Sequence, residues 1–167
     1  SVRGISHHNR PTGALVSLLK TKISNLKPRV IFTIHNLANQ GVWNAKEISK
    51  WLGNMPFKNR SGNLNFMAEG IESADVVTTV SQTYAKEILT KQYGAALANL
   101  LKKRARQRKF IGILNGIDYD AWPLRKKNKA KFQRDLGLEA NSHSPIFGLV
   151  ARLTYQKGVN LIAPLVP

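Results

Sequence analysis

The chain alternates between short apolar runs rich in β-branched residues and longer segments with helical periodicity, and this alternation limits what it can fold into. Leucine and isoleucine recur every three or four positions at 13–26, which predicts an amphipathic helix. The apolar runs predicted as strands are 30–34, 75–80 and 110–114, and the further helical segments are 65–73, 82–90 and 95–106. Strands alternating with helices are typical of a parallel sheet. We therefore predict an α/β fold.

Several local signals set the ends of these elements. Lys27-Pro28 ends the first helix, because the residue before proline disfavours helical geometry. Ser81 has the side chain of a good N-cap for the helix that follows it. The long segment between residues 35 and 62 is expected to be a loop with a short helix at 45–52. Asn115-Gly116 predicts a tight turn after the third strand.

The organisation changes after residue 118. The stretch 119–129 is polar and basic, a short helix is predicted at 129–138 with Gly137 closing it, and a turn cluster follows at 141–145. The apolar run 146–150 predicts another buried strand, and Gly158 introduces a helix from Val159. We assign 1–118 to one domain, 119–145 to a linker region and 146–167 to the start of a second, truncated domain.

Composition excludes several classes of protein. Hydrophobic residues make up 43% of the 167 residues, which is enough for a core. The absence of cysteine excludes disulfides and thiolate sites, and no apolar run is long enough for a transmembrane helix. The first ten residues lack the apolar stretch of a signal peptide and an initiating methionine, so we expect the true start to lie upstream. The lack of cysteine also fits a cytoplasmic protein, and no membrane partner is expected.

The net charge of +17 is large for this length, and two basic runs, 102–109 and 125–129, contribute much of it. Such a field attracts phosphate groups on nucleotides or nucleic acids. Charge runs are more often solvated surface, and this interpretation carries more weight here. Because the chain shows neither an RNA-binding motif nor an aromatic stacking pattern, nucleic acid is not expected as a partner. A basic nucleic-acid-binding module remains the least favoured alternative.

Three polar loops follow predicted strands, where ligands bind in open α/β sheets. They are His35–Gly41, Asn115–Asp118 and Arg152–Gly158. His35 either closes a strand through a hydrogen bond or contacts a substrate hydroxyl, and the residues alone leave both options open. Arg152 and Lys157 flank a loop ahead of a helix N-terminus, so they are either a diphosphate site or two surface cations.

The usual catalytic and cofactor motifs are absent. The loop at 152–158 matches neither a Walker loop nor the glycine-rich dinucleotide fingerprint, and no nucleophile elbow is present. No cluster of histidine and carboxylate residues has metal-ligand spacing in the sequence. The sequence therefore predicts no metal and no cofactor.

Four segments in order resemble the bacterial glycogen synthases and plant starch synthases, the family 5 glycosyltransferases. The segments are Val30–Gly41, Ala74–Ile88, Gly112–Trp122 and Phe147–Gly158. The resemblance covers nearly the whole chain, from about His8 to Ile162. It implies a Rossmann-like parallel sheet within a two-domain GT-B glycosyltransferase. It also implies transfer of glucose from ADP-glucose to the non-reducing end of an α-1,4-glucan (glycogen or starch), with retention of configuration.

The same resemblance implies roles for individual residues. His35 would be the catalytic histidine that touches the donor glucose, and Asn115 would lie near the sugar. Arg152 and Lys157 would hold the donor's diphosphate. The complete set of substrate-binding residues implied is Asn36, Gln40, Asn115, Arg152, Lys157 and Gly158.

The chain also departs from the family pattern. The usual Lys-x-Gly-Gly-Leu loop and the later acidic motif are absent, so we expect an internal piece that is inactive alone. The family's His-Asp-Trp-His-Thr-Gly pattern stands here as His8-Asn9-Arg10-Pro11-Thr12-Gly13, Asn39 replaces the usual tyrosine, and the segment after Trp122 is short. These departures support an alternative, a non-catalytic or degenerate homologue that keeps the fold.

Overall fold

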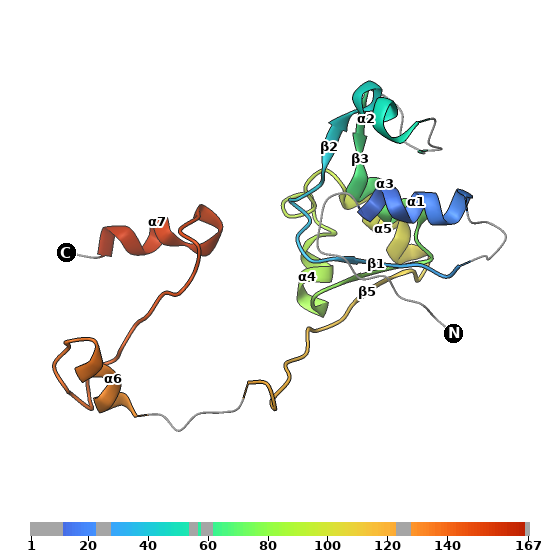
Figure 1. The fold of residues 1–167 in the computed structure, drawn as a ribbon. Helices are drawn as coiled ribbons and strands as arrows, with labels where there is room; N and C mark the ends of the chain where they lie inside the picture. The colour runs from blue at the N-terminus through green and yellow to red at the C-terminus, as the bar shows by residue number, and fades with distance from the viewer. Residues whose placement is uncertain (1–11, 23–27, 54–56, 58–61, 123–127, 166–167) are drawn as a thin grey trace. The chain divides into compact units, whose positions relative to one another are not determined.

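The structure is a computed structural model that describes residues 12–22, 28–53, 57, 62–122 and 128–165. The chain divides into two compact units, one ending at Ile117 and the other beginning at Asp118 (Figure 1). Each unit is described by itself. The assignment of 1–118, 119–145 and 146–167 to two domains and a linker of one enzyme stays a prediction.

The first unit is built on a three-stranded parallel sheet. The strands are β1 (Ile31–Ile34), β4 (Val76–Thr79) and β5 (Phe110–Gly112), in the order β1-β4-β5. β4 is the central strand, with Ile31 opposite Val76 on one side and Phe110 opposite Val77 on the other. Parallel neighbours need a crossover connection, and the helices between these strands supply it. The predicted α/β fold with a parallel sheet is confirmed.

Three helices lie together beside this sheet: α1 (Thr12–Lys22), α3 (Phe66–Ser73) and α5 (Ala98–Arg106) (Figure 1). Phe32 of β1 points toward α3, because its ring occupies the space that a Cβ on Gly70 would need. The core formed here contains Val16, Val30, Phe32, Ile34, Leu37, Ala68, Ile71, Ala74, Val77, Ile88, Leu97 and Leu101. The predicted helices at 13–26 and 65–73 are thus confirmed over the described residues, with Asn65 as the N-cap of α3. The helix predicted at 95–106 begins only at Ala98, because Ala95 and Ala96 have positive φ values.

A short hairpin stands beside this core, and the sequence did not predict it. β2 (Val42–Asn44) pairs antiparallel with β3 (Asn63–Asn65), and α2 (Ala45–Leu52) lies between them in the chain. The predicted short helix at 45–52 is confirmed. The strands were missed because both are three residues long and two of the three residues in β3 are asparagine, which is rare in strands.

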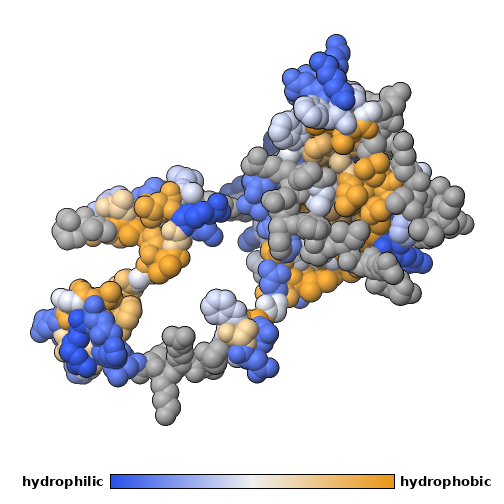
Figure 2. All heavy atoms as spheres, viewed as in Figure 1, coloured by the Kyte–Doolittle hydropathy of each residue, from blue (hydrophilic) through white to orange (hydrophobic). Residues whose placement is uncertain are grey.

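The second unit contains only short elements, namely α6 (Lys129–Asp135), η2 (Tyr155–Lys157), α7 (Val159–Ile162) and η3 (Ala163–Leu165). The predicted buried strand at 146–150 is wrong: these residues form no strand, and Val150 is fully exposed. A strand needs a hydrogen-bonded neighbour, and no strand is described in this unit. Figure 2 shows apolar surface on both helical parts of the unit, and no apolar side chain among its described residues is buried.

Two of the predicted helix ends are confirmed, whereas one predicted turn is wrong. Ser81 caps α4 (Gln82–Glu87), because its Oγ accepts a hydrogen bond from the Tyr84 amide at 3.0 Å. Gly137 has a φ of 70° directly after the end of α6, as expected for a helix-closing glycine. The turn predicted at Asn115-Gly116 is wrong, since the chain runs on without a turn from residue 113 to residue 118. Its neighbours Leu114 and Ile117 are exposed.

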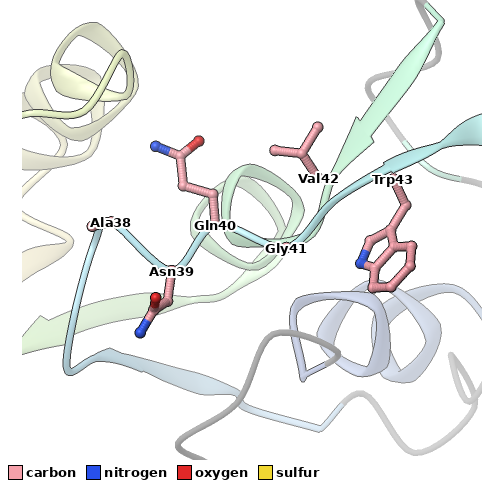
Figure 3. Close-up of a pocket in the computed structure, with 6 residues that line it drawn as sticks. All are labelled: Ala38, Asn39, Gln40, Gly41, Val42 and Trp43. Atoms are coloured by element: carbon pink, nitrogen blue, oxygen red, sulfur yellow. The ribbon is translucent and has the colours of Figure 1, made fainter.

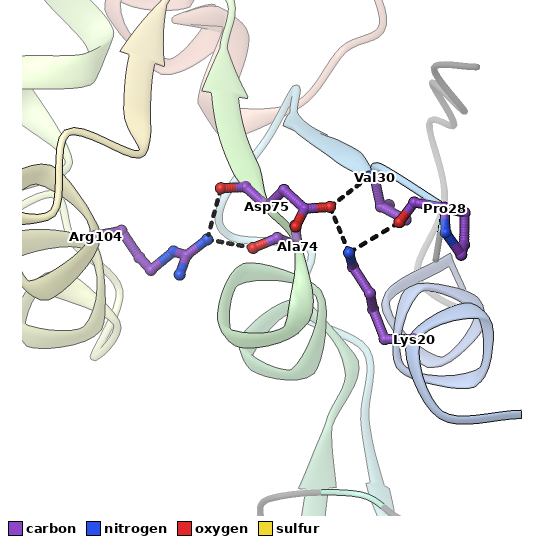
Figure 4. A network of polar contacts seen from close by, with 6 residues as sticks. All are labelled: Lys20, Pro28, Val30, Ala74, Asp75 and Arg104. Carbon is purple, nitrogen blue, oxygen red and sulfur yellow. Dashed lines mark hydrogen bonds and ion pairs between the residues drawn. The ribbon is translucent and has the colours of Figure 1, made fainter. Parts of the chain in front are cut away.

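A polar network fixes the edge of the sheet where the strands begin (Figure 4). The Asp75 carboxylate accepts hydrogen bonds from the Val30 amide at 2.7 Å and forms an ion pair with Lys20 at 2.5 Å. The Lys20 ammonium also donates to the Pro28 carbonyl at 2.9 Å. This network joins α1 to the beginnings of β1 and β4, which are far apart in the sequence.

Arg104 continues the network from α5. Its buried guanidinium donates to the carbonyls of Ala74 and Asp75, and to the Gln107 side chain at 3.2 Å. Burial lowers the pKa of Arg104, whereas the nearby charges of Asp75 and Glu72 raise it. A buried charge is tolerated where its donors find acceptors, and the two carbonyls and Gln107 accept from the two terminal nitrogens. The Arg104 Nε has no hydrogen-bond partner among the described residues.

The network predicts a dependence of stability on pH. Burial alone would raise the pKa of Asp75, but hydrogen bonds from Lys20 and Val30 and the charges of Lys20 and Arg29 outweigh it, so the pKa lies below its ordinary value of 3.8. The stabilisation is therefore complete above that ordinary value and is lost as the pH falls below it. We expect Asp75→Asn to lower the free energy of unfolding by about 1 kcal/mol at pH 7. Urea unfolding of both chains between pH 7 and pH 3 checks this, because the difference should shrink below pH 4. A difference that stays constant over this range contradicts the assignment.

The contact between α1 and α3 gives a second prediction. At Gly13 a Cβ would overlap the Phe66 carbonyl oxygen, so the two helices approach as closely as they do only because this side chain is missing. Gly13→Ala should separate the helices and lower the free energy of unfolding by about 3 kcal/mol or more. Gly116→Ala is the matched control, since nothing lies within 4 Å of its Cβ position. Equal thermal unfolding curves for the two variants would show that α1 does not pack as described.

Candidate functional site

The carboxyl ends of the parallel strands meet at one edge of the sheet, and polar segments follow each of them. His35 comes directly after β1, Ser81 follows β4 by two residues, and Asn115 follows β5 by three. The ladder continues a little past β5, because the Ile113 amide donates to the Thr79 carbonyl at 2.7 Å. His35 is half-buried and Asn115 is exposed. This edge is where an open α/β sheet binds its ligands.

The loop after β1 is held by its own side chains and by α4. The Asn36 Oδ1 accepts a hydrogen bond from the Ala38 amide at 3.0 Å, which forms an Asx turn. The Tyr84 hydroxyl accepts one from the Leu37 amide at 3.1 Å, and the Leu37 side chain is buried. The position of the backbone just after His35 is therefore set by α4, whose beginning Ser81 fixes.

Gln40 braces the end of the same loop. Its Nε2 donates to the Ala95 carbonyl, and its Oε1 accepts from the Asn65 Nδ2 at 2.5 Å. The Asn65 Oδ1 in turn caps α3 by accepting from the Ala68 amide at 3.0 Å. Both ends of the Gln40 amide are thus engaged inside the protein. Its predicted contact with substrate stays a prediction.

The segment whose carbonyl accepts the hydrogen bond from Gln40 has an unusual backbone conformation. Ala95 and Ala96 have φ values of 43° and 66°, a left-handed conformation that residues other than glycine adopt at a cost. They precede Leu97, the residue before α5. Such a conformation persists where surrounding contacts fix it, and the hydrogen bond from Gln40 is one of those contacts.

A pocket of about 420 Å³ is lined by this loop (Figure 3). The lining residues are Ala38, Asn39, Gln40, Gly41, Val42 and Trp43. Asn39 and Gln40 point to different sides of the loop, and the Trp43 ring points toward α1. The exposed Asn39 leaves its amide available to a ligand. Val42 and Trp43 were missed in the sequence because the hairpin that presents them was not predicted.

The remaining predicted residues lie in the second unit. Arg152 is exposed, Lys157 ends η2, and Gly158 has a φ of 75° directly before α7. The left-handed Gly158 lets the chain turn from one short helix into the next. The structure therefore places His35, Asn36, Gln40 and Asn115 on one edge of the first unit. Arg152, Lys157 and Gly158 share one loop of the second.

The described part of the chain shows no group of three or more histidine, cysteine or carboxylate side chains that could hold a metal ion. It also contains no helix long and apolar enough to cross a membrane. The prediction that the protein needs no cofactor stays a prediction.

A parallel α/β sheet with a polar loop at its carboxyl edge defines the broad class of Rossmann-like ligand-binding domains. Comparison with known proteins narrows this class. Residues 4–103 match the family described as the starch synthase catalytic domain. The chain belongs to this family of glycosyltransferases, and the predicted GT-B type of fold is confirmed.

The relatives support the same family. The chain is 41% identical over 165 residues to a glycogen synthase of Anaeromyxobacter dehalogenans, a match that covers 83% of this chain and 34% of the relative. It is 35% identical over 185 residues to the glycogen synthase of Pseudothermotoga lettingae, covering 95% of this chain and 38% of the relative. The chain thus spans little more than a third of the length of these relatives.

A solved structure gives the corresponding match in three dimensions. The catalytic domain of starch synthase IV from Arabidopsis thaliana, bound to ADP and acarbose, matches with a TM-score of 0.78 and 33% sequence identity. The match covers 96% of this chain and 38% of that one. The alignment with the Anaeromyxobacter dehalogenans enzyme is 165 positions long, yet it contains only 83% of the 167 residues of this chain. That relative therefore has residues within the aligned stretch that have no counterpart in this chain.

The two side-chain hydrogen bonds of Gln40 predict how fast nearby amides of the loop exchange with solvent. The Phe66 and Met67 amides donate to the carbonyls of Gly41 and Gln40 at 3.1 and 3.0 Å. Gln40→Met keeps the shape of the side chain but removes its two hydrogen bonds, worth about 1–2 kcal/mol together. We expect these two amides to exchange with solvent about tenfold faster, as measured by hydrogen exchange. Gln82→Met, on the exposed side of α4, is the control and should leave both rates unchanged.

Proposed function

We propose that the chain is part of a glucosyltransferase that moves glucose from ADP-glucose to the non-reducing end of an α-1,4-glucan with retention of configuration. One observation carries the proposal: 96% of the chain matches a starch synthase catalytic domain that was solved with ADP and acarbose. The glycogen synthases among the relatives support the same reaction. The donor is then a substrate, and no cofactor is required.

In this reaction the bond between the glucose C1 and the β-phosphate oxygen breaks. A new bond forms between C1 and the 4-hydroxyl oxygen of the acceptor, and the proton of that hydroxyl leaves. Negative charge grows on the departing ADP, so cations placed at the diphosphate lower the barrier. The Arg152 guanidinium suits this role because it can donate two parallel hydrogen bonds to phosphate oxygens. The Lys157 ammonium suits it as a compact positive charge.

The first unit would supply the sugar side of the site. His35 is half-buried at the end of β1, and hydrogen bonds with Asn65 and Tyr84 hold its loop. This supports the proposal that its imidazole meets a hydroxyl of the donor glucose. Asn115 reaches the same edge from β5. Asn36 and Gln40 shape the loop, and Gly158 shapes the loop that carries Lys157. A cytoplasmic location would suit these substrates.

A second candidate is a homologue that keeps the fold without catalysis. It is favoured by the replacement of the family's aspartate and tryptophan by Asn9 and Arg10, which lie outside the described residues, and by Asn39 at the pocket. Both candidates predict the same fold and differ only in whether glucose is transferred.

A chimera separates the two. The matched segment of the Anaeromyxobacter dehalogenans glycogen synthase is replaced by this chain, and transfer of labelled glucose from ADP-glucose to glycogen is measured. We expect transfer, and we expect His35→Ala to lower kcat by about 100-fold or more, as for the loss of a group that acts on the reacting sugar. Arg152→Gln and Lys157→Gln should each cost a similar factor.

Lys50→Gln, an exposed residue of α2, is the matched control and should leave the rate unchanged. A chimera that unfolds cooperatively but transfers no glucose would favour the non-catalytic homologue. Equal rates for the chimera and its His35→Ala variant would remove His35 from the site.

A further inference from the structure

Exposed cations gather at the edge of the sheet where the strands begin. Arg29 precedes β1, Arg106 ends α5, and Arg108 and Lys109 precede β5. We call these four residues the amino-edge basic surface. The register of each strand pair, continued by one residue, sets Val30 beside Asp75 and Lys109 beside Val76 on neighbouring strands, which lie about 4.8 Å apart. Arg29 and Lys109 therefore lie on the two sides of β4.

No acidic side chain among the described residues forms an ion pair with this surface. The ion pairs among the described residues are Lys20–Asp75, Lys103–Glu72 and Lys131–Asp135, and none includes a residue of the amino-edge basic surface. Asp75 is paired with Lys20 and the Val30 amide, and among the four surface residues only the charge of Arg29 acts on its pKa. The positive field at this edge is thus left to solvent, in a chain whose net charge is +17.

The backbone holds one of these cations in an uncommon conformation. Arg108 has a φ of 56° at the position after α5 that glycine usually occupies. Its amide donates to the Ala105 carbonyl at 2.9 Å, and the Lys109 amide donates to the Arg104 carbonyl at 3.0 Å, which together form a Schellman motif. An arginine here costs free energy relative to glycine, and it is held in place between the helix and the strand.

The position of this surface excludes a role at the sugar-nucleotide site. His35 and Asn115 follow the carboxyl ends of β1 and β5, whereas Arg29 and Lys109 precede the amino ends of the same strands. All three strands run parallel, so the two groups lie at opposite edges of the sheet. An anionic partner of the basic surface would therefore differ from the donor's diphosphate.

The chemistry of the surface favours a phosphate backbone over a protein. Residues 28–30 and 98–110 contain no exposed large hydrophobic side chain, whereas the centre of a protein interface is apolar. No exposed aromatic ring lies among these residues, so single-stranded bases would find nothing to stack on. Three of the four cations are arginine, which suits phosphate oxygens.

We propose that the amino-edge basic surface binds the sugar–phosphate backbone of a nucleic-acid duplex through charge, without reading its sequence. The lack of a base-reading motif led to the expectation that nucleic acid is not a partner. That expectation concerns sequence-specific recognition, and contacts to phosphates alone require no such motif.

The test compares two variants of the full chain that lose equal charge. In the first, Arg29, Arg106, Arg108 and Lys109 are all changed to glutamine. In the second, the control, Lys46, Lys50, Lys86 and Lys91 are changed to glutamine; these are exposed residues on α2, on α4 and just after α4. Binding to a labelled 20-base-pair DNA duplex is measured by fluorescence anisotropy across a series of salt concentrations.

We expect the first variant to bind at least tenfold more weakly, with the slope of log affinity against log salt reduced by about three to four. The control variant should keep most of the affinity and most of the salt dependence of the unaltered chain. Equal losses in the two variants would mean that binding follows the overall charge, and the proposal would be overturned. Equal affinity of the unaltered chain for poly-glutamate, or for vesicles of phosphatidylserine and phosphatidylcholine, would overturn it as well.

A measurement on the unaltered chain covers the case in which the first variant does not fold. Backbone amide resonances are followed by NMR as the same duplex is added. We expect the shifts to concentrate at residues 29 and 106–109. Shifts concentrated on α2 and α4, or spread evenly over the first unit, would contradict the proposal.

Discussion

The pairing of β4 with both of its neighbours is the constraint on which the rest of the first unit depends. Val77 and Thr79 are almost fully buried, and the Thr79 hydroxyl donates to the Ile34 carbonyl at 2.9 Å across the strands. The Thr33 and Thr78 hydroxyls lie 2.8 Å apart in a hydrogen bond on the other face. Because β4 fixes the register of β1 and β5, it decides which residues share each edge of the sheet. The loop that carries His35 and the basic surface both take their positions from it.

Much of this unit could be predicted from the sequence, and the exceptions have identifiable causes. Apolar runs and helical periodicity located β1, β4 and β5 and the helices beside them, since burial imposes both patterns. The β2–β3 hairpin gave no such signal, because its strands are short and their pattern of apolar residues is weak. The run at 146–150 has the composition of a strand, but composition does not supply the neighbouring strand that its backbone needs.

The site was predictable only in part, for a related reason. His35 and Asn115 could be located because strand ends are visible in a sequence and parallel strands end at one edge. The brace at Gln40 could not, since it depends on Ala95, which is 55 residues away, and on a left-handed backbone there. Alanine carries no sequence signal for that conformation, whereas glycine would have done so. The left-handed conformation of Arg108 could not be predicted either, because arginine, like alanine, carries no sequence signal for it.

The order of strands in the sheet also bears on how quickly the chain folds. Among the described strands β1 pairs with β4, and their partners are separated by 45 positions along the chain, whereas helical segments such as α3 need only local contacts. Contacts between distant residues must close a long loop before they contribute stability, so they slow folding. Until β4 has been formed and has met β1, the apolar side chains of β1 remain open to other chains. During that interval association between molecules competes with folding, and dilute conditions will favour the folded state.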